Sequence, residues 1–167
     1  SLEEELPEKA VLYFTGLGYA ESYVNGEKVT DRVLFPSYTV YEKTVEYTAA
    51  DVTEQLKKGE NVLGLWVGGH WPLDEKLRAK DVYSEAFYRG RCVGFAELHL
   101  TFKEGKKVIL GTDDTWQTSM SPIEISSVFD GEQYDARREQ TGWSLPGFDT
   151  NGWKNAYLAK EPLGKLV

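Results

Sequence analysis

The sequence predicts an all-β protein, a jelly-roll β-sandwich with one short helix. About nine or ten short segments with strand-like patterns follow one another at spacings of roughly 8–12 residues, which is typical of antiparallel sandwiches. A parallel sheet would show strands alternating with long helical patterns, and the sequence has no such alternation. The chain has 167 residues, enough for one good core and too few for two. We therefore expect an N-terminal extension over residues 1–9 and a single sandwich domain over residues 10–167.

The first strands are indicated by alternation and by a turn signal. In Tyr19–Val24 the aromatic and charged side chains alternate with Ala20, Ser22 and Val24, so the two sets should face opposite sides of a sheet. Asn25-Gly26 follows and is the strongest hairpin signal in the chain, because both positions of a type I′ turn need a positive φ. The strands expected in this part of the chain are Val11–Thr15, Tyr19–Val24, Glu27–Val29 and Glu42–Tyr47, with Pro36 in the loop between the last two.

A capped helix and a buried strand are predicted next. Asp51 is placed as a helix N-cap, with Glu54 three residues on as in a capping box. Gly59 is expected to end this helix at the left-handed C′ position. The run Asn61–Val67 is apolar without a polar face, so we expect a strand with neighbours on both sides and cover on both faces.

The second half of the chain reads as a charged excursion followed by short strands. Residues 72–83 carry many charges and few apolar side chains, and a loop of this length often carries function. Glu104-Gly105 is expected to form a turn between two strands. The strands expected here are Arg91–Phe102, Lys107–Leu110, Gln117–Met120, Ile123–Phe129, Gln133–Arg137 and Asn155–Ala159.

The charge balance excludes two classes of partner. The net charge is −8, so nucleic acid and anionic membrane surfaces would repel the protein. The acidic N-terminus has no signal-peptide pattern, and no apolar run reaches the roughly 18 residues of a membrane span. The single cysteine, Cys92, lies in an alternating run and is expected to be a small buried side chain. Periplasmic, extracellular and cytoplasmic locations are all compatible with this composition.

An ordered set of motifs resembles a known family. The motifs are YVNGEKV at Tyr23–Val29, the stretch Asp51–Trp71, GTDDTW at Gly111–Trp116, SPI at Ser121–Ile123, DGEQYDAR at Asp130–Arg137, GW at Gly142-Trp143, and GFDTNGW at Gly147–Trp153. In this order they resemble the N-terminal accessory domain of bacterial α-L-rhamnosidases, a galactose-binding-like β-sandwich. The C-terminal EPLGKLV is similar to the segment that leads from that domain into the rest of the enzyme.

The resemblance implies a non-catalytic domain of a glycoside hydrolase. In this family the hydrolytic glutamates lie in a separate helical barrel domain, so the catalytic and other domains of the parent enzyme are the implied partners. Some accessory sandwiches of rhamnosidases bind rhamnose through a calcium ion, which makes Ca²⁺ and a rhamnose-containing glycan possible ligands here. The sequence departs from the family pattern at His70-Trp71-Pro72, where a charged excursion replaces further glycine and tyrosine.

Two groups of residues are candidates for a site. His70 and Trp71, with Asp74 and Tyr88 from the following excursion, could bind a carbohydrate, because an indole face stacks on a pyranose ring. The simpler interpretation, which we favour, is that Trp71 closes one end of the sandwich and His70 is merely exposed.

The second group is an acidic cluster of Asp130, Glu132 and Asp135. These carboxylates could hold calcium or line an interface, and a catalytic role would need two of them at a suitable separation. An ion pair between Asp135 and Arg137 that closes a loop is the simpler alternative. Asp113 is expected to serve a turn, and His99 to lie on the polar face of its strand.

Three functional hypotheses remain open from the sequence. The first is an accessory, possibly carbohydrate-binding domain of an α-L-rhamnosidase-like enzyme. The second is a structural or protein-interaction sandwich without affinity for sugar. The third, a free-standing enzyme, would need paired acids about 5–9 Å apart in a cleft.

Overall fold

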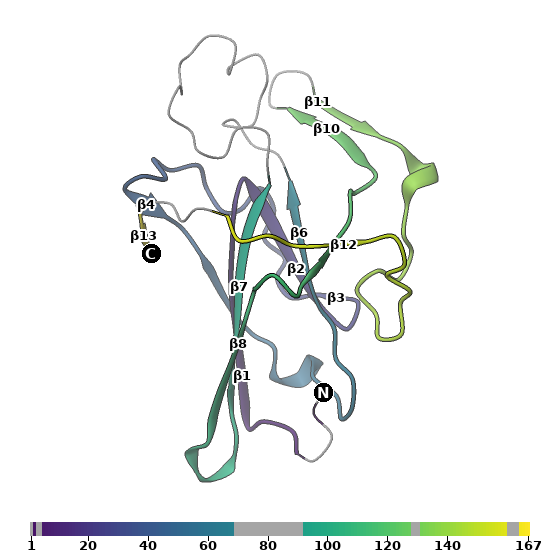
Figure 1. Ribbon diagram of the computed structural model, residues 1–167. Coiled ribbons are helices and arrows are strands. Elements are labelled where there is room, and N and C mark those ends of the chain that lie inside the picture. The colour runs from purple at the N-terminus through teal and green to yellow at the C-terminus, as the bar shows by residue number, and fades with distance from the viewer. Residues whose placement is uncertain (1, 3–4, 69–91, 128–130, 160–163) are drawn as a thin grey trace.

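The computed structural model describes residues 2, 5–68, 92–127, 131–159 and 164–167 (Figure 1). Two antiparallel sheets pack face to face, and short two-stranded ladders and loops surround them. The predicted all-β jelly-roll sandwich is confirmed, and the helices among the described residues are single 3₁₀ turns. No described helix is long and apolar enough to cross a membrane.

The larger sheet has four strands, built around β1 (Lys9–Leu17). β5 (Thr48–Asp51) and β7 (Val93–Thr101) flank β1, and β8 (Lys107–Gly111) pairs with β7. The alternation in β1 and β7 places Leu12 opposite Leu98 and Ala10 opposite Leu100, all at most 7% exposed. The side chains between these positions point to the other face of the sheet, because successive residues of a strand alternate.

The smaller sheet has the order β3-β2-β6, with β3 at Glu27–Lys28, β2 at Tyr19–Val24 and β6 at Leu63–Gly68. The predicted alternation in β2 is confirmed, since Ala20, Ser22 and Val24 are buried. The predicted turn is also confirmed, because Asn25 and Gly26 have φ of 51° and 87°.

The core lies between the inner faces of these two sheets. Its fully buried members come from both sheets and from the turn after β5. They are Ala10, Leu12, Phe14, Ala20, Val24, Val52, Leu56, Ala96, Leu98 and Leu100.

Three short ladders complete the described structure. Two are antiparallel, between β10 (Ile123–Ser127) and β11 (Gly131–Tyr134), and between β9 (Gln117–Thr118) and β12 (Lys154–Asn155). The third is parallel, between β4 (Thr44–Val45) and β13 (Lys165–Leu166). The 3₁₀ turns are η1 (Thr53–Gln55), η3 (Lys103–Gly105) and η4 (Ala136–Arg138).

The prediction for the helix near Asp51 was wrong in its details. Asp51 ends β5, a strand that was not predicted, because residues 48–51 pair with β1. Its carboxylate accepts from the amide and the hydroxyl of Thr53, at 3.0 and 2.6 Å, and the 3₁₀ turn is preceded by Val52. Gly59 does have a positive φ of 87°, but it lies in a separate turn beyond Gln55.

Two further expectations need correction. Among the described residues β6 pairs only with β2, so it is an edge strand rather than a strand with two neighbours. Its apolar run is explained by cover on both faces, from the core and from Trp143, which lies over Gly64. Cys92 is exposed rather than buried, because β7 begins only at Val93 and the thiol lies outside the ladder.

Candidate functional site

The predicted carbohydrate site lies outside the described residues. His70, Trp71, Asp74 and Tyr88 all belong to the segment 69–91, and the sugar-platform assignment therefore stays a prediction. The site that the structure does describe consists of acidic turns at the end of β11 and an aromatic cluster on the smaller sheet.

The acidic cluster is organised by ion pairs. The Asp135 carboxylate lies at the start of η4, accepts from the Arg137 amide at 3.1 Å, and holds the Arg137 guanidinium through two contacts of 2.8 Å. These contacts lower the pKa of Asp135 below its ordinary value, the side-chain hydrogen bond from Arg137 being the main cause. The loop-closing Asp135–Arg137 pair is therefore present, and both carboxylate oxygens are engaged.

A second ion pair connects the same turn to β10. Arg138 Nη1 lies 2.7 Å from Glu124 Oε1, and the other Glu124 oxygen accepts from Gln133 at 2.9 Å. Glu132 is exposed on β11, and Asp130 lies outside the described residues. Within the part of the chain that the structure describes, no three acidic, histidine or cysteine side chains converge to hold a metal.

The described members of this cluster do not fit a calcium site. Calcium needs several free hard oxygens, and those of Asp135 are occupied by a guanidinium. The metal or interface role of Asp130, Glu132 and Asp135 stays a prediction. The Asp113 side chain serves its turn as expected, accepting from the Thr115 amide at 2.9 Å and from the Thr115 hydroxyl at 2.6 Å.

The aromatic cluster is formed by Tyr23, Trp66 and Trp143 on the outer face of the smaller sheet. Tyr23 and Trp66 project from neighbouring strands, and Trp143 reaches over them from the turn after η4. The Trp143 ring lies 5.4 Å from Tyr23 and 6.0 Å from Trp66, both edge to face. Gly64 makes room for it, because a Cβ there would lie 2.6 Å from the indole.

A polar rim borders this aromatic cluster. The Tyr23 hydroxyl donates to Glu21 at 2.8 Å, and Lys28 Nζ lies 2.5 Å from the other Glu21 oxygen. Burial, followed by the contact with Glu21, raises the pKa of Tyr23 to about 12. The phenol therefore remains a hydrogen-bond donor over the whole physiological range.

Sequence reasoning missed this aromatic cluster. Trp66 is predicted to lie in a strand covered on both faces, and Trp143 is identified from the sequence only as part of the GW motif. The available signal was Gly64, a glycine inside an otherwise apolar strand, which often marks the close approach of another group.

A ring cluster also lies on the outer face of the larger sheet. Tyr13 contacts His99 with ring centroids 4.8 Å apart and Tyr47 at 5.9 Å. His99 Nε2 lies 2.9 Å from Glu97 Oε2, and both side chains are 38% exposed. His99 is thus on the polar face of β7, as predicted.

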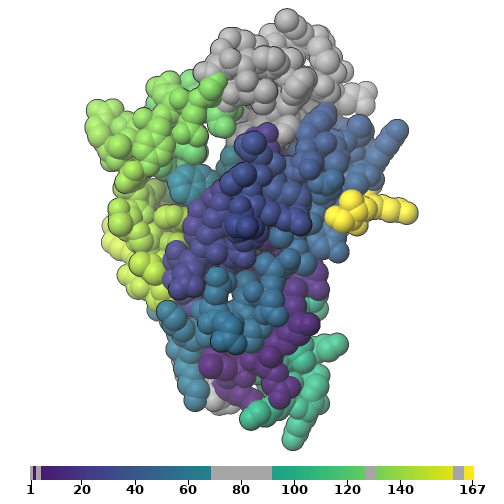
Figure 2. Space-filling view, turned by 180° about the vertical axis from the view of Figure 1, so that it is seen from behind, coloured from purple at the N-terminus to yellow at the C-terminus, as the bar shows by residue number. Residues whose placement is uncertain are grey.

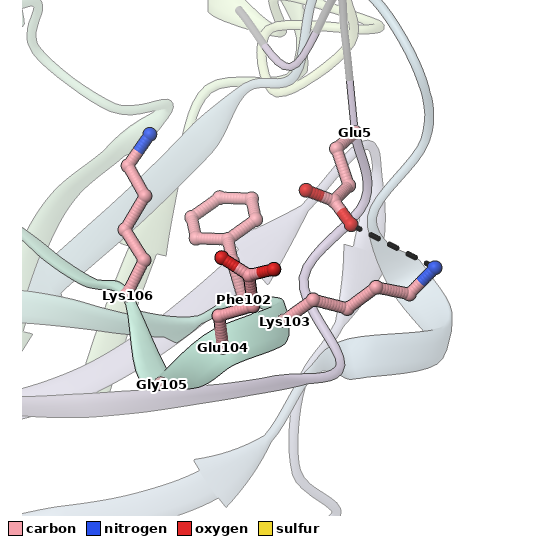
Figure 3. Close-up of a pocket in the computed structure, with 6 residues that line it drawn as sticks. All are labelled: Glu5, Phe102, Lys103, Glu104, Gly105 and Lys106. Atoms are coloured by element: carbon pink, nitrogen blue, oxygen red, sulfur yellow. Dashed lines mark ion pairs between the residues drawn. The ribbon is translucent and has the colours of Figure 1, made fainter.

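A shallow pocket of about 560 Å³ lies at the turn between β7 and β8 (Figure 3). Lys103 Nζ forms a long ion pair with Glu5 at 3.9 Å, and Lys106 lies over the Phe102 ring at 5.7 Å. Figure 3 shows the two lysines pointing in different directions rather than toward a common point. The pocket is therefore a charged hollow between exposed side chains.

The fold is that of a β-sandwich domain, built from the two packed sheets and their short flanking ladders. The chain matches the family described as "Alpha-L-rhamnosidase N-terminal domain" over residues 5–167. The protein therefore belongs to the family of N-terminal domains of α-L-rhamnosidases.

Several relatives show the same relationship. The chain is 36% identical over 146 residues to an α-L-rhamnosidase of Formosa agariphila, and 34% identical over its whole length to one of an Alteromonas species. Its structure is similar to that of an α-L-rhamnosidase from Dictyoglumus thermophilum, with a TM-score of 0.86 and 34% identity over 99% of the chain. It is also similar to the Streptomyces avermitilis α-L-rhamnosidase complexed with L-rhamnose, with a TM-score of 0.84, 30% identity and 98% coverage.

The chain is short beside these enzymes. It spans 15% of the Formosa protein and 18% of the Alteromonas protein, and 17% and 16% of the two solved chains. More than four fifths of each of these relatives therefore lies outside the part that the chain matches.

Proposed function

We propose that this chain is a non-catalytic accessory domain that packs on the other domains of an α-L-rhamnosidase and assists its binding of carbohydrate. The observation that carries the proposal is the match over residues 5–167 to one domain of much longer glycoside hydrolases. The ion pairs at η4 support a non-catalytic role for two of the acids. Asp135, at the start of η4, and Glu124, on β10, are each held by an arginine of that turn.

The proposed ligand is a rhamnose-containing glycan. One relative of similar structure has been solved with L-rhamnose, which makes this sugar the first ligand to test. The residues to test for the contact are His70, Trp71, Asp74 and Tyr88, since an indole stacks on a pyranose and the methyl group of rhamnose adds apolar area. The titration below decides between this role and the simpler one, in which Trp71 closes one end of the sandwich. Of the two roles predicted for Asp130, Glu132 and Asp135, metal or interface, we propose the domain interface, because Arg137 occupies both Asp135 oxygens.

Isothermal titration of the chain with L-rhamnose, with and without Ca²⁺, tests the sugar-binding part. We expect heat of binding that Trp71→Ala abolishes and that Leu158→Ala, a change of another apolar side chain that is 75% exposed, leaves intact. No heat under either condition would remove the carbohydrate role and leave the packing role.

The alternative is a structural or interaction domain without affinity for sugar. The geometry of the aromatic cluster favours this alternative at the smaller sheet. Tyr23, Trp66 and Trp143 pack edge to face on one another, which accounts for these rings as packing groups of the sandwich.

A further inference from the structure

The C-terminal strand β13 forms a parallel ladder with the segment around β4. Lys165 N donates to Lys43 O, Val167 N donates to Val45 O, and Tyr47 N donates to Val167 O, each at 3.0 Å. Figures 1 and 2 show this end of the chain lying against the segment that contains β4.

The ladder begins at a position that only glycine fits. A Cβ at residue 164 would lie 2.3 Å from Tyr41 O and 2.7 Å from Thr44 N, both backbone atoms. The Gly164 amide donates to the same Tyr41 carbonyl at 3.1 Å. The close approach at Gly164 therefore fixes where β13 begins and which edge it follows.

The edge that β13 follows continues directly into β5. The even-numbered residues of this segment bond to β1. Just after β5, Val52 N donates to Ala10 O at 2.9 Å. Hydrogen-bonded pairs of an antiparallel ladder recur at every second residue, so Ala50 and Thr48 bond to β1 as well. Upstream, Glu46 O also faces β1, where it accepts from the Thr15 hydroxyl at 2.5 Å. The odd-numbered residues therefore point their backbone groups away from β1.

Among the residues that the structure describes, partners occupy the first half of this outward edge. β13 donates to the Lys43 and Val45 carbonyls and accepts from the Tyr47 amide, and it ends level with Tyr47. Beyond it, the Tyr47 carbonyl, both backbone groups of Ala49 and the Asp51 amide have no partner within the described residues, where β5 is the edge of its sheet. Residues 48–51 hold neither proline nor lysine, the residues that commonly protect an edge from pairing.

We propose that in a longer rhamnosidase chain the residues that follow Val167 continue β13 as a parallel strand along the free edge of β5. The second added residue donates to Tyr47 O and accepts from Ala49 N. The fourth donates to Ala49 O and accepts from Asp51 N. Parallel pairing fixes this register, because each residue of one strand bonds to two alternate residues of its neighbour.

The consequence is a rigid connection to the next part of the enzyme. A strand added to the larger sheet carries the chain past the Tyr13–Tyr47–His99 ring cluster rather than through a flexible linker. The inference rests on the proposed function in one respect: the added strand comes from the enzyme of which this chain is a domain.

The test compares amide hydrogen exchange in the 167-residue protein with a version that carries four added residues, Thr-Val-Thr-Val, after Val167. We expect the Ala49 and Asp51 amides to exchange about tenfold more slowly or better in the extended protein, since hydrogen-bonded strand amides exchange only after local opening. The Ala50 amide, already bonded to β1, should change much less.

Proline in the added segment tests the register. At the second added position proline removes the donor to Tyr47 O, and the protection of Ala49 should fall. At the first added position the amide points away from β5, so proline there should leave the protection intact. Equal exchange of Ala49 in all versions would overturn the inference.

The same exchange measured on the full-length parent enzyme tests the origin of the strand. Protection of Ala49 and Asp51 there supports the proposal, and fast exchange contradicts it. The result is independent of sugar titration: binding of rhamnose with an unprotected edge would refute the strand and keep the accessory role.

Discussion

Replacing Gly64 by alanine adds one methyl group and tests whether Trp143 covers the outer face of the smaller sheet at that position. In Gly64→Ala the new Cβ would lie 2.6 and 2.8 Å from two atoms of the Trp143 ring and 3.2 Å from Ser144 Cβ. The ring cannot simply move away, because Tyr23 and Trp66 pack against it. Overpacking of this kind costs about 1–3 kcal/mol, which exceeds the roughly 0.4–1 kcal/mol that replacing glycine usually contributes through the unfolded chain.

Gly68→Ala on the same strand is the matched control. No atom of the residues that the structure describes lies within 4 Å of a Cβ built there, so this change should be neutral or stabilise the protein by at most about 1 kcal/mol. Urea unfolding followed by tryptophan fluorescence measures both free energies of unfolding. In the double variant Gly64→Ala/Trp143→Phe the smaller ring should relieve part of the clash. The loss of unfolding free energy should then be smaller than the sum of the two single losses, which shows that the positions are coupled. If Gly64→Ala had the same free energy of unfolding and the same tryptophan fluorescence as the unsubstituted protein, the close contact with Trp143 would be refuted.

Three further predictions concern the turn, the edge and the acidic cluster. Asn25→Ala removes a buried side chain that donates to Gln55 O and Asn61 Oδ1 and accepts from Val62 N, so we expect a loss of about 2–4 kcal/mol by urea unfolding. The exposed Asn151→Ala is its control, and an equal effect of the two would contradict the assignment. Gly164→Ala should release β13 from β4, so the Tyr47 and Val167 amides should exchange their hydrogens faster. The Leu12 amide, in the central strand β1, should stay protected. Unchanged exchange at Tyr47 would contradict the close approach of Gly164 to the Tyr41 carbonyl. Because Arg137 lowers the pKa of Asp135 below its ordinary value of 3.8, the pair stabilises the fold fully above that pH, and its contribution is lost as the pH falls through the folded-state pKa. Asp135→Asn should therefore lower the melting temperature above pH 3.8 and have little effect at more acidic pH; a deficit that persists in acid would argue for a packing defect instead.

Local patterns predicted the parts of the fold that depend on local physics. The alternation in β2 and the Asn25-Gly26 turn require only neighbouring residues, and both are confirmed. The turn at Glu104-Gly105 is confirmed in the same way, with φ of 58° and 77°. The Asp113 turn follows from the preference of a short carboxylate for nearby amides.

The errors occur where a distant segment decides the structure. Residues 48–51 carry two alanines and an N-cap signal, and only the pairing with β1 makes them a strand. The apolar run of β6 correctly predicted cover on both faces, one of them supplied by Trp143, but among the described residues it has one neighbouring strand rather than two. Of the candidate site, the Asp135–Arg137 pair could be predicted from two nearby residues. The aromatic cluster could not, since Trp66 and Trp143 come together only in the folded chain.

Hydrolysis of an aryl α-L-rhamnoside tests the role of an accessory domain most directly. The isolated chain and the full-length parent enzyme are assayed side by side at equal molar concentration. We predict turnover by the parent enzyme and none by the isolated chain, because the chain matches one domain of much longer enzymes and two of its acids, Glu124 and Asp135, are held in ion pairs. Turnover by the isolated chain would contradict its non-catalytic role. If that turnover survived Asp135→Asn and Glu124→Gln, the hydrolytic site would lie elsewhere in this domain.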